Sequence, residues 1–505
     1  MRVATESVLI RVVATAAATS LRACSVVSLL AGMSGCGGGD GAASPSSATS
    51  TPAPTPAPSA PATLVVGSAQ SIDGGASGNP VSVRIARSAN GDGFAVWQAD
   101  DGTRRNLWAN RYAATTAAWG SPIHIETSSA DIDDFDLTVD AGGNATVAWH
   151  EPPADPTLGT GTVTGVRFDG GAGAWTLPVL LSSDGSQPRV ASDATGAVLA
   201  VYVGVRGHLV RGRFFEPASG TWQPEAAIEQ NTTATGFSSG PMALLDGSGN
   251  ALAAWPNGRT GAGAVASNYF SHSDGSWVFQ LPPNEVGSLG GVPGSFTSSG
   301  APGNVQLATT TGGDFLLAWQ TTLFDDPERS AEIRIARFKS SDRTWSDAQT
   351  LVPNNGRSIR LQRIGSETSG VALVLWTEND GTRTALKTIS MAPAGTSCSA
   401  VQVIDGAVGG GAAQADLAVD PQGRAMAIWQ QFEGGRPDDG SRSNIAISRF
   451  DGGWSDAVLA ETQPGNAISP RASANGGQAL LGWIQSEDGV NRVKALLQPL
   501  VDAGR

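Results

Sequence analysis

Cysteine, histidine and lysine are scarce in this chain of 505 residues. Three cysteines cannot build a disulfide framework, and four scattered histidines leave little for a transition-metal site. The formal net charge is −13, which excludes the basic surface of a nucleic-acid-binding protein. No stretch has a convincing helical period. Glycine and tryptophan, with 65 and 14 residues, are by contrast abundant.

The first 35 residues have the order of a secretory signal. Three arginines precede an apolar run at residues 23–33, which ends in small residues before Cys36. A run of about 11 residues is too short to cross a bilayer as a helix but typical of a signal peptide. We therefore expect residues 1–35 to be a signal and not a structural element.

The residues around Cys36 indicate how the chain is held. Met33-Ser34-Gly35-Cys36 resembles the bacterial lipobox, and this resemblance implies that Cys36 carries a lipid (palmitate) and becomes the mature N-terminus. Gly37 follows in place of aspartate, which by the same resemblance favours the outer membrane, with the leaflet left open. An ordinary signal peptide with an incidental cysteine is the alternative. Residues 36–62 are rich in Pro, Ser and Thr with almost no charge, so we expect a disordered tether.

From residue 63 onward one motif recurs. A buried-looking aromatic residue appears every 52 to 64 residues, and a glycine stands six residues before each one. The aromatics are Trp97, Trp149, Tyr202, Trp255, Trp319, Trp376, Trp429 and Trp483. The glycines are Gly91, Gly143, Gly196, Gly249, Gly313, Gly370, Gly423 and Gly477. Glycine with nearby aspartate is typical of tight hairpins, so each aromatic is expected on a strand just after a hairpin.

Each unit continues with a third strand and a second tryptophan. The third strand carries an arginine followed by an aromatic in five units, at Arg111-Tyr112, Arg167-Phe168, Arg213-Phe214, Arg337-Phe338 and Arg449-Phe450. We expect this arginine to pair with turn carboxylates of the neighbouring unit, although it could also bind a sugar or a carboxylate. In the sixth unit the slot of the second tryptophan holds Cys398, which we interpret as a small core residue.

Four short strands per unit of about 55 residues predict an all-β fold, a β-propeller with eight four-stranded blades. The eighth unit lacks its last strand, and residues 64–73 align with last strands elsewhere. We therefore expect the N-terminal strand to complete the last blade and close a single domain of residues 63–505. Seven blades with a stray hairpin, or two domains, are the alternatives.

Acidic residues cluster in the loops expected on one face of the ring. They are Asp100, Asp101, Asp131, Asp133, Asp134, Glu151, Asp325 and Asp326. Carboxylates at this density could bind Ca²⁺ or a cationic partner, but no run has the spacing of a calcium loop. Polar loop tips that face water are the stronger explanation. We predict no cofactor and no dedicated metal site.

The repeats distantly resemble those of sialidase-type propellers, whose Asp-boxes also join a turn aspartate and glycine to a tryptophan. Sialidases grip a carboxylate with three arginines and use a tyrosine activated by glutamate. Here Tyr112, Tyr202 and Tyr269 all fall in structural slots of the repeat. The pair Arg84 and Arg87 resembles the arginine motif of sialidases only weakly. The resemblance therefore implies architecture without the active site.

The sequence thus predicts a non-catalytic lipoprotein of the cell envelope. Its propeller is expected to act, as a monomer, as a binding or scaffold module for a protein or an envelope polymer. The alternative is a carbohydrate-binding propeller, lectin-like or a degenerate glycosidase. No Gly-x-Ser-x-Gly elbow, phosphate loop or paired-histidine motif points to another reaction.

Overall fold

The structure is a computed structural model that describes residues 64–501, apart from 76–77, 156–160, 205–208, 230–235, 260–261, 279–299, 311, 324–330, 368–369 and 393–396. Cys36, the signal and the tether lie outside the described residues, as do Asp325 and Asp326. Every element within the described part is a β-strand, and no helix there is long and apolar enough to cross a membrane.

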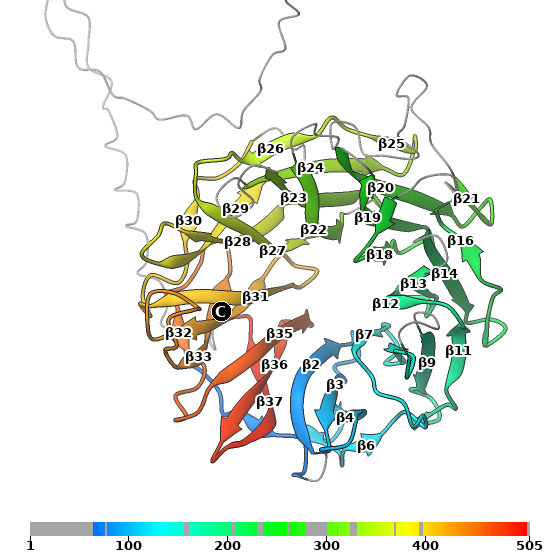
Figure 1. The fold of residues 1–505 in the computed structure, drawn as a ribbon, viewed down its shortest axis with the longest axis horizontal. Helices are drawn as coiled ribbons and strands as arrows, with labels where there is room; N and C mark the ends of the chain where they lie inside the picture. Colours follow the sequence, from blue (N-terminus) through cyan, green and yellow to red (C-terminus); the bar gives the residue numbers. More distant parts are fainter. Residues whose placement is uncertain are drawn as a thin grey trace, which may run out of the picture.

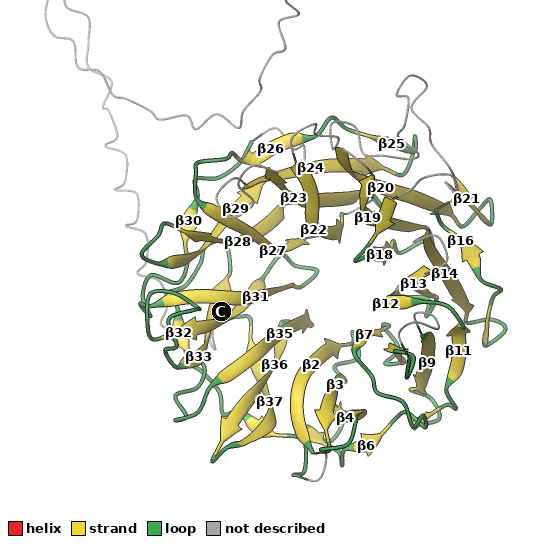
Figure 2. Ribbon diagram, in the orientation of Figure 1, coloured by secondary structure: helices red, strands yellow, loops and turns green. Residues whose placement is uncertain are grey.

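The strands form eight antiparallel sheets arranged as blades around a ring (Figure 1; Figure 2). The innermost strands, which open blades 1 to 8, are β2 (Asn79–Arg87), β7 (Asp134–Val139), β12 (Ser186–Ser192), β18 (Met242–Leu245), β22 (Gly300–Thr309), β27 (Ser358–Ser366), β31 (Gly411–Val419) and β35 (Ala467–Asn475). The second strands are β3 (Gly93–Asp100), β8 (Ala145–Glu151), β13 (Val198–Gly204), β19 (Ala251–Arg259), β23 (Phe315–Leu323), β28 (Ala372–Asn379), β32 (Ala425–Phe432) and β36 (Gln478–Glu487). In blade 4, β17 (Gly236–Ser238) also pairs with β19.

The outer half of each blade is more irregular. The third strands are β4 (Arg105–Ala113), β9 (Thr162–Asp169), β14 (Leu209–Glu216), β20 (Ala262–Ser271), β24 (Ala331–Lys339), β29 (Thr384–Met391), β33 (Ser443–Phe450) and β37 (Val490–Pro499). In four blades the fourth strand is split into two pieces: β5 (Ala118–Trp119) with β6 (Ile123–His124), β10 (Ala174–Trp175) with β11 (Val179–Ser182), β15 (Thr221–Trp222) with β16 (Ala226–Ala227), and β25 (Thr344–Trp345) with β26 (Gln349–Val352). Elsewhere it is a single short piece, β21 (Ser276–Val278), β30 (Gln402–Val403) or β34 (Val458–Leu459).

The N-terminal strand closes the ring, as predicted. Strand β1 (Gln70–Ser71) pairs antiparallel with β37 as the outermost strand of blade 8. The Gln498 side chain extends this contact by accepting a hydrogen bond from the Gly67 N–H at 3.0 Å and donating one to the Val65 carbonyl at 2.7 Å. Leu64 lies buried among residues of blades 7 and 8. Blade 8 is therefore built from both ends of the chain.

The hairpin prediction is also confirmed. All eight repeat glycines have positive φ, from +77° to +92°, which side chains other than glycine rarely adopt. In the hairpin of blade 2, the Asp140 carboxylate accepts a hydrogen bond from the Asn144 N–H at 2.9 Å, so the aspartate closes the turn that the glycine permits.

The core is divided between the blades. The eight repeat aromatics are among the largest fully buried side chains of the described residues. Buried apolar residues form eight clusters, one at each junction between neighbouring blades. Each second strand is buried on both faces because it packs against the blade on either side.

The third-strand pattern needs two corrections. Phe215, not Phe214, pairs with Trp222 in blade 3, so the true register of this strand lies one residue beyond Arg213. Two of the repeated arginines pair with a hairpin carboxylate of their own blade and not of the next one: Arg111 contacts Asp92 at 2.7 Å, and Arg337 contacts Asp314 at 3.8 Å. The Cys398 prediction is confirmed. Cys398 occupies the slot of the second tryptophan, where its backbone forms a β-bridge with Met391, and its side chain packs against a core cluster.

Candidate functional site

One position of the innermost strands brings charged side chains to the centre of the ring. It lies opposite the residue that immediately precedes each repeat aromatic in the second strand. In blade order this position holds Arg84, Asp136, Arg189, Met242, Gln306, Arg363, Asp416 and Arg471. We call Arg84, Arg189, Arg363 and Arg471 the central arginine cluster. The four arginines come from blades 1, 3, 6 and 8, and they lie close enough to influence one another electrostatically.

Bulges in the innermost strands help to aim these side chains. The register with the second strand shifts shortly before the central position in six blades. Gln187, Gln414 and Ser469 take positive φ at such shifts, from +49° to +58°. A bulge turns the following side chain away from the regular alternation of a strand. Two of these bulges are followed at once by proline and then by a cluster arginine, Arg189 or Arg471.

Arg363 has a carboxylate and an amide oxygen as partners. Its guanidinium donates to the Asp416 carboxylate at 2.6 Å and to the Gln306 side-chain oxygen at 3.0 Å. Asp416 also accepts the backbone N–H of Ala472, in the next blade, at 3.1 Å. Asp416 raises the pKa of Arg363 above its ordinary value despite burial. Burial opposes the ionisation of Asp416, but Arg363 and Arg471 outweigh it and hold the pKa of Asp416 below its ordinary value.

Arg189 is similarly compensated on the other side of the ring. It donates to Asp134 at 2.9 Å, while Asp136 accepts the backbone N–H of Val190 at 3.0 Å. Burial lowers the pKa of Arg189, but Asp134 and Asp136 together raise it above its ordinary value. The two carboxylates of blade 2 thus bind both the side chain and the backbone of blade 3.

Arg84 and Arg471, on the adjoining blades 1 and 8, are compensated much less. Arg84 is 3.9 Å from Asp136 and lies over the Phe135 ring, 5.3 Å from its centroid. Burial lowers the pKa of Arg84 more than Asp136 raises it. Arg471 donates to the Pro470 carbonyl at 2.7 Å, and within the described part of the chain no carboxylate forms an ion pair with it.

The environment of Arg471 is unfavourable for a cation. Its Nε atom is buried and has no hydrogen-bond partner among the described residues. Burial and the neighbouring charges of Arg84 and Arg363 lower the pKa of Arg471 to about 9. A bound anion would offset the repulsion between the guanidinium groups and would accept a hydrogen bond from the Nε atom of Arg471.

Charge and access both favour an anion at the centre. The four guanidinium groups face three carboxylates, those of Asp134, Asp136 and Asp416, which leaves an excess of one positive charge in a protein that is acidic overall. The side chains of Arg84, Arg189 and Arg363 remain 24%, 27% and 34% exposed, so solvent reaches them. Arginine presents a planar fork of donors that suits carboxylate, sulfate or phosphate.

The structure describes six of the eight residues of the predicted acidic face. Most of these carboxylates hold loops or neighbouring side chains in place. Hydrogen bonds from Thr103 and the backbone N–H of Arg104 hold the pKa of Asp101 below its ordinary value. Asp100 accepts the Gly102 N–H at 2.8 Å, and Asp131 accepts the Arg105 N–H at 2.9 Å. These three carboxylates therefore lie around the loop between β3 and β4.

The other described members of this set point elsewhere. Asp133 contacts the His150 ring at 2.6 Å, and Glu151 accepts the Trp149 indole N–H at 2.7 Å. Asp134 contacts Arg189, a member of the central arginine cluster. No group of three or more His, Cys, Asp or Glu side chains that could hold a metal ion occurs in the described ranges. The acidic face as a docking surface stays a prediction.

The tyrosine interpretation holds for Tyr112, which pairs with Trp119, and for Tyr202, but Tyr269 stands one residue before the aromatic slot, which Phe270 fills opposite Trp277. Tyr202 is fully buried, and its hydroxyl group donates to Glu225 at 2.8 Å. Burial and Glu225 raise its pKa above the ordinary value. This hydroxyl is therefore held in the core and is not presented to a substrate.

Comparisons with known proteins support the fold and nothing finer. No family model matches the chain, and no curated protein matches it in sequence. Among solved structures, a PL25 polysaccharide lyase, an ulvan lyase, matches with a TM-score of 0.50 at 12% identity, covering 85% of this chain and 95% of the lyase. The Dos1 propeller matches with a TM-score of 0.48 at 10% identity, covering 86% and 95%. A Hadza microbial sialidase matches with a TM-score of 0.37 at 15% identity, covering 70% and 76%. Sequence identities this low show the propeller fold alone.

Sequence reasoning missed the central arginine cluster. A signal was present, since seven of the eight central residues stand thirteen positions before a repeat aromatic and Arg471 stands twelve before Trp483. The position holds arginine, aspartate, methionine and glutamine, so it carries no common chemistry that would mark it as a repeat position. Only closure of the ring brings these side chains together.

Proposed function

We propose that this protein is a binding protein of the bacterial cell envelope that takes an anionic saccharide at the central arginine cluster. The observation that carries the proposal is the state of Arg471, a guanidinium group near Arg84 whose buried Nε atom has no hydrogen-bond partner and for which no carboxylate of the described residues forms an ion pair. A uronate carboxylate or a sulfate ester between Arg84 and Arg471 would complete the charge balance of the centre.

The geometry favours binding over catalysis. A general acid needs a carboxyl group whose pKa is raised towards neutrality. Asp416 has the opposite shift and its oxygens are occupied by Arg363 and the Ala472 N–H. Asp134 and Asp136 likewise hold Arg189 and the backbone of Val190. The carboxylates of the centre position the arginines and the neighbouring backbone, so turnover is not expected.

A saccharide is the ligand class that best fits the proposed setting. An envelope protein on a long tether meets polymers that carry carboxylate, sulfate or phosphate groups, and arginine forks recognise all three. One solved propeller of similar fold is a polysaccharide lyase, which makes uronate-containing oligosaccharides a sensible first probe. The fold does not choose among acidic sugars, so the binding experiment must do so.

The envelope location rests on the lipobox-like sequence at Cys36. We expect the wild-type protein to sediment with outer membranes and to take up labelled palmitate. The variant Cys36→Ser should lose the label and, once its signal is removed, appear in the soluble fraction, since the tether alone gives no membrane affinity. Membrane retention of this variant would remove the anchor from the proposal without affecting the binding site.

Isothermal titration calorimetry can test the central site. The purified protein is titrated with a tetrasaccharide that contains uronate, with sodium sulfate and with sodium phosphate. We expect the tetrasaccharide to bind most tightly and Arg471→Gln to weaken it at least tenfold. Arg436→Gln is the matched control, because the side chain of this exposed arginine pairs with Asp438 in a loop. Equal affinity in the wild type and in Arg471→Gln would contradict the proposal.

Equal binding of sulfate and of the tetrasaccharide would also be informative. It would retain an anion site at the centre but remove the saccharide from the proposal. Affinity should in addition fall with rising salt, because charge pairing at a solvent-accessible site is screened.

A further inference from the structure

A groove between blades 3 and 4 departs from the repeat in a way that bears on ligand binding. In blades 1, 2, 5 and 7 an arginine precedes the third-strand aromatic that pairs with the second tryptophan. In blade 3 this aromatic is Phe215, opposite Trp222, so Phe214 stands in the arginine position. In blade 4 the pair is Phe270 with Trp277, and Tyr269 stands there.

In blades 1 and 2 this arginine covers an aromatic ring of the next blade. Arg111 of blade 1 lies over Phe168 of blade 2, and Arg167 of blade 2 lies over Phe215 of blade 3, at 5.1 Å and 3.8 Å from the ring centroids. Between blades 3 and 4 the guanidinium group is missing. Phe214 instead contacts Phe270 with ring centroids 4.3 Å apart.

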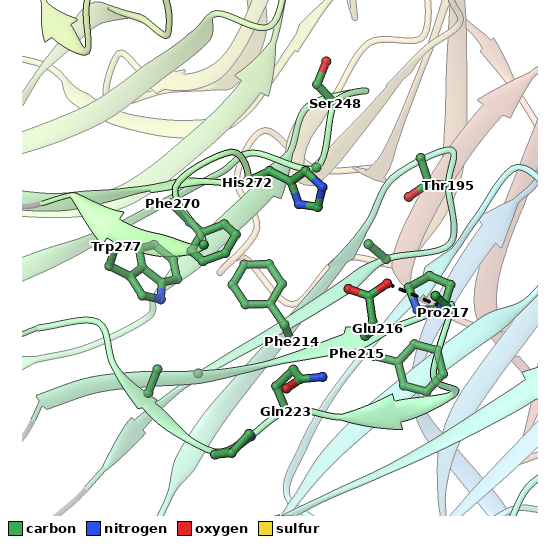
Figure 3. A pocket seen from close by; sticks show the side chains of 17 residues that line it. Thr195, Phe214, Phe215, Glu216, Pro217, Gln223, Ser248, Phe270, His272 and Trp277 are labelled. Atoms are coloured by element: carbon green, nitrogen blue, oxygen red, sulfur yellow. Dashed lines mark hydrogen bonds between the residues drawn. The ribbon is translucent and has the colours of Figure 1, made fainter.

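The result is an aromatic wall on a hollowed surface. Trp277 lies 6.1 Å from Phe214 and 5.6 Å from Phe270 between ring centroids, and all three side chains are half-buried. They line a cavity of 540 Å³, within the range of small-ligand sites (Figure 3). The three rings thus present apolar surface to a ligand.

Polar side chains stand around this wall. Figure 3 shows Glu216, Gln223, Ser248 and His272 around the same cavity as the rings. Gln223, Ser248 and His272 are exposed, and they offer an amide, a hydroxyl group and an imidazole as donors and acceptors. Glu216 is the one carboxylate among the lining residues, and these residues include no arginine or lysine.

We infer that this groove is a second binding site, one that takes the uncharged sugar units of a saccharide. A pyranose ring has an apolar face of C–H groups that can stack on aromatic rings, and hydroxyl groups at its rim that need both donors and acceptors. The groove supplies both, because its lining joins the three rings to Gln223, Ser248 and His272. An anionic sugar is disfavoured here because Glu216 is the only full charge of the lining, so the groove differs in specificity from the central arginine cluster.

The test uses saturation-transfer NMR and calorimetry on the purified protein with neutral hexamers of glucose, galactose and mannose. At least one neutral oligosaccharide should bind. Phe214→Arg restores the residue that the repeat carries elsewhere, so the fold should tolerate it, while the guanidinium group covers the aromatic wall and lowers the affinity at least tenfold. Phe450→Leu, which changes the equivalent strand of blade 7, is the matched control and should leave the affinity unchanged.

Several outcomes would overturn the inference. They are absence of binding for all neutral hexamers, unchanged affinity in a folded Phe214→Arg variant, and tighter binding of choline, which would make the site one for organic cations. If Phe214→Arg fails to fold, Trp277→Leu serves as the second variant with the same expected loss. The central site is tested apart, because Arg471→Gln should leave neutral-sugar binding intact and Phe214→Arg should leave uronate binding intact.

Discussion

Arg363 and Arg471 occupy equivalent positions of the repeat but have opposite surroundings. Arg363 is held by Asp416 and Gln306, whereas no carboxylate ion pair is found for Arg471 within the described residues. From the sequence alone, these two arginines cannot be distinguished. The difference arises because the neighbouring blades contribute different side chains to the shared centre. This difference in surroundings predicts that replacing each arginine with glutamine will affect stability differently.

Arg363→Gln should lower the free energy of unfolding by about 1–3 kcal/mol, because it leaves the Asp416 carboxylate without its main partner in a partly solvated site. Arg471→Gln should change the free energy of unfolding by less than about 1 kcal/mol or raise it, since it removes an under-compensated cation. Urea denaturation of both variants measures the difference. Equal destabilisation would show that the two arginines are equally well compensated.

Asp416 also makes stability depend on pH in a defined direction. Its folded-state pKa lies below the ordinary value of 3.8, so the ionised form stabilises the folded protein above that pH, and this contribution is lost as the pH falls through the folded-state pKa. Asp416→Asn should therefore be less stable than the wild type at pH 7. The gap in thermal unfolding temperature should narrow at pH 3. A gap that stays constant between these two pH values would refute the ionic role of Asp416.

At the scale of the elements, the hairpins were the most predictable feature. A glycine at one fixed position of the repeat predicts a residue with positive φ, and a nearby aspartate predicts the turn. The third strands were less predictable, because in blade 3 two consecutive phenylalanines, Phe214 and Phe215, fit the aromatic slot equally well in sequence. Only pairing with Trp222 fixes the register. An error of one residue there hides the replacement of an arginine by Phe214.

The hairpin of blade 2 allows a matched test of the glycine argument. Gly143 has φ of +84°, and a Cβ atom there would lie 2.5 Å from the Asn90 amide nitrogen. Gly142, beside it, has no positive φ, and its added Cβ would meet only ordinary contacts. Gly143→Ala should cost about 1–2 kcal/mol of stability, and Gly142→Ala less than about 0.5 kcal/mol. Chemical denaturation measures both, and similar costs would count against the turn geometry.

At the scale of the whole molecule, ring closure is the feature on which the other features depend. The spacing of the repeat aromatics predicts eight blades, and the missing last strand of the eighth unit predicts that the N-terminal strand completes it. Both predictions are confirmed by the pairing of β1 with β37. The central arginine cluster could not be predicted in this way, because its members are far apart in sequence and the same position holds aspartate, methionine or glutamine in the other four blades. Likewise, Asp134 was grouped with the loop carboxylates but contacts Arg189 in the closed ring.

Deleting residues 64–73 should strongly destabilise the domain. It removes the outermost strand of blade 8, the contacts of Gln498 and the buried side chains of Leu64 and Ile72, and it exposes the edge of β37. We expect a lower thermal unfolding temperature and a tendency to aggregate, measured by calorimetry and light scattering. Deletion of residues 37–50 in the tether is the control and should change neither. Unchanged unfolding of the shorter protein would disprove the role of closure.

The central claim is that the ring holds an anionic saccharide at its centre through arginines that the fold leaves under-compensated. The most direct measurement is an experimental structure of the protein with a bound uronate tetrasaccharide. Our account predicts a carboxylate between Arg84 and Arg471, within hydrogen-bonding distance of both guanidinium groups. An empty centre at saturating ligand, or a tetrasaccharide bound only in the loops or between the blades, would contradict it.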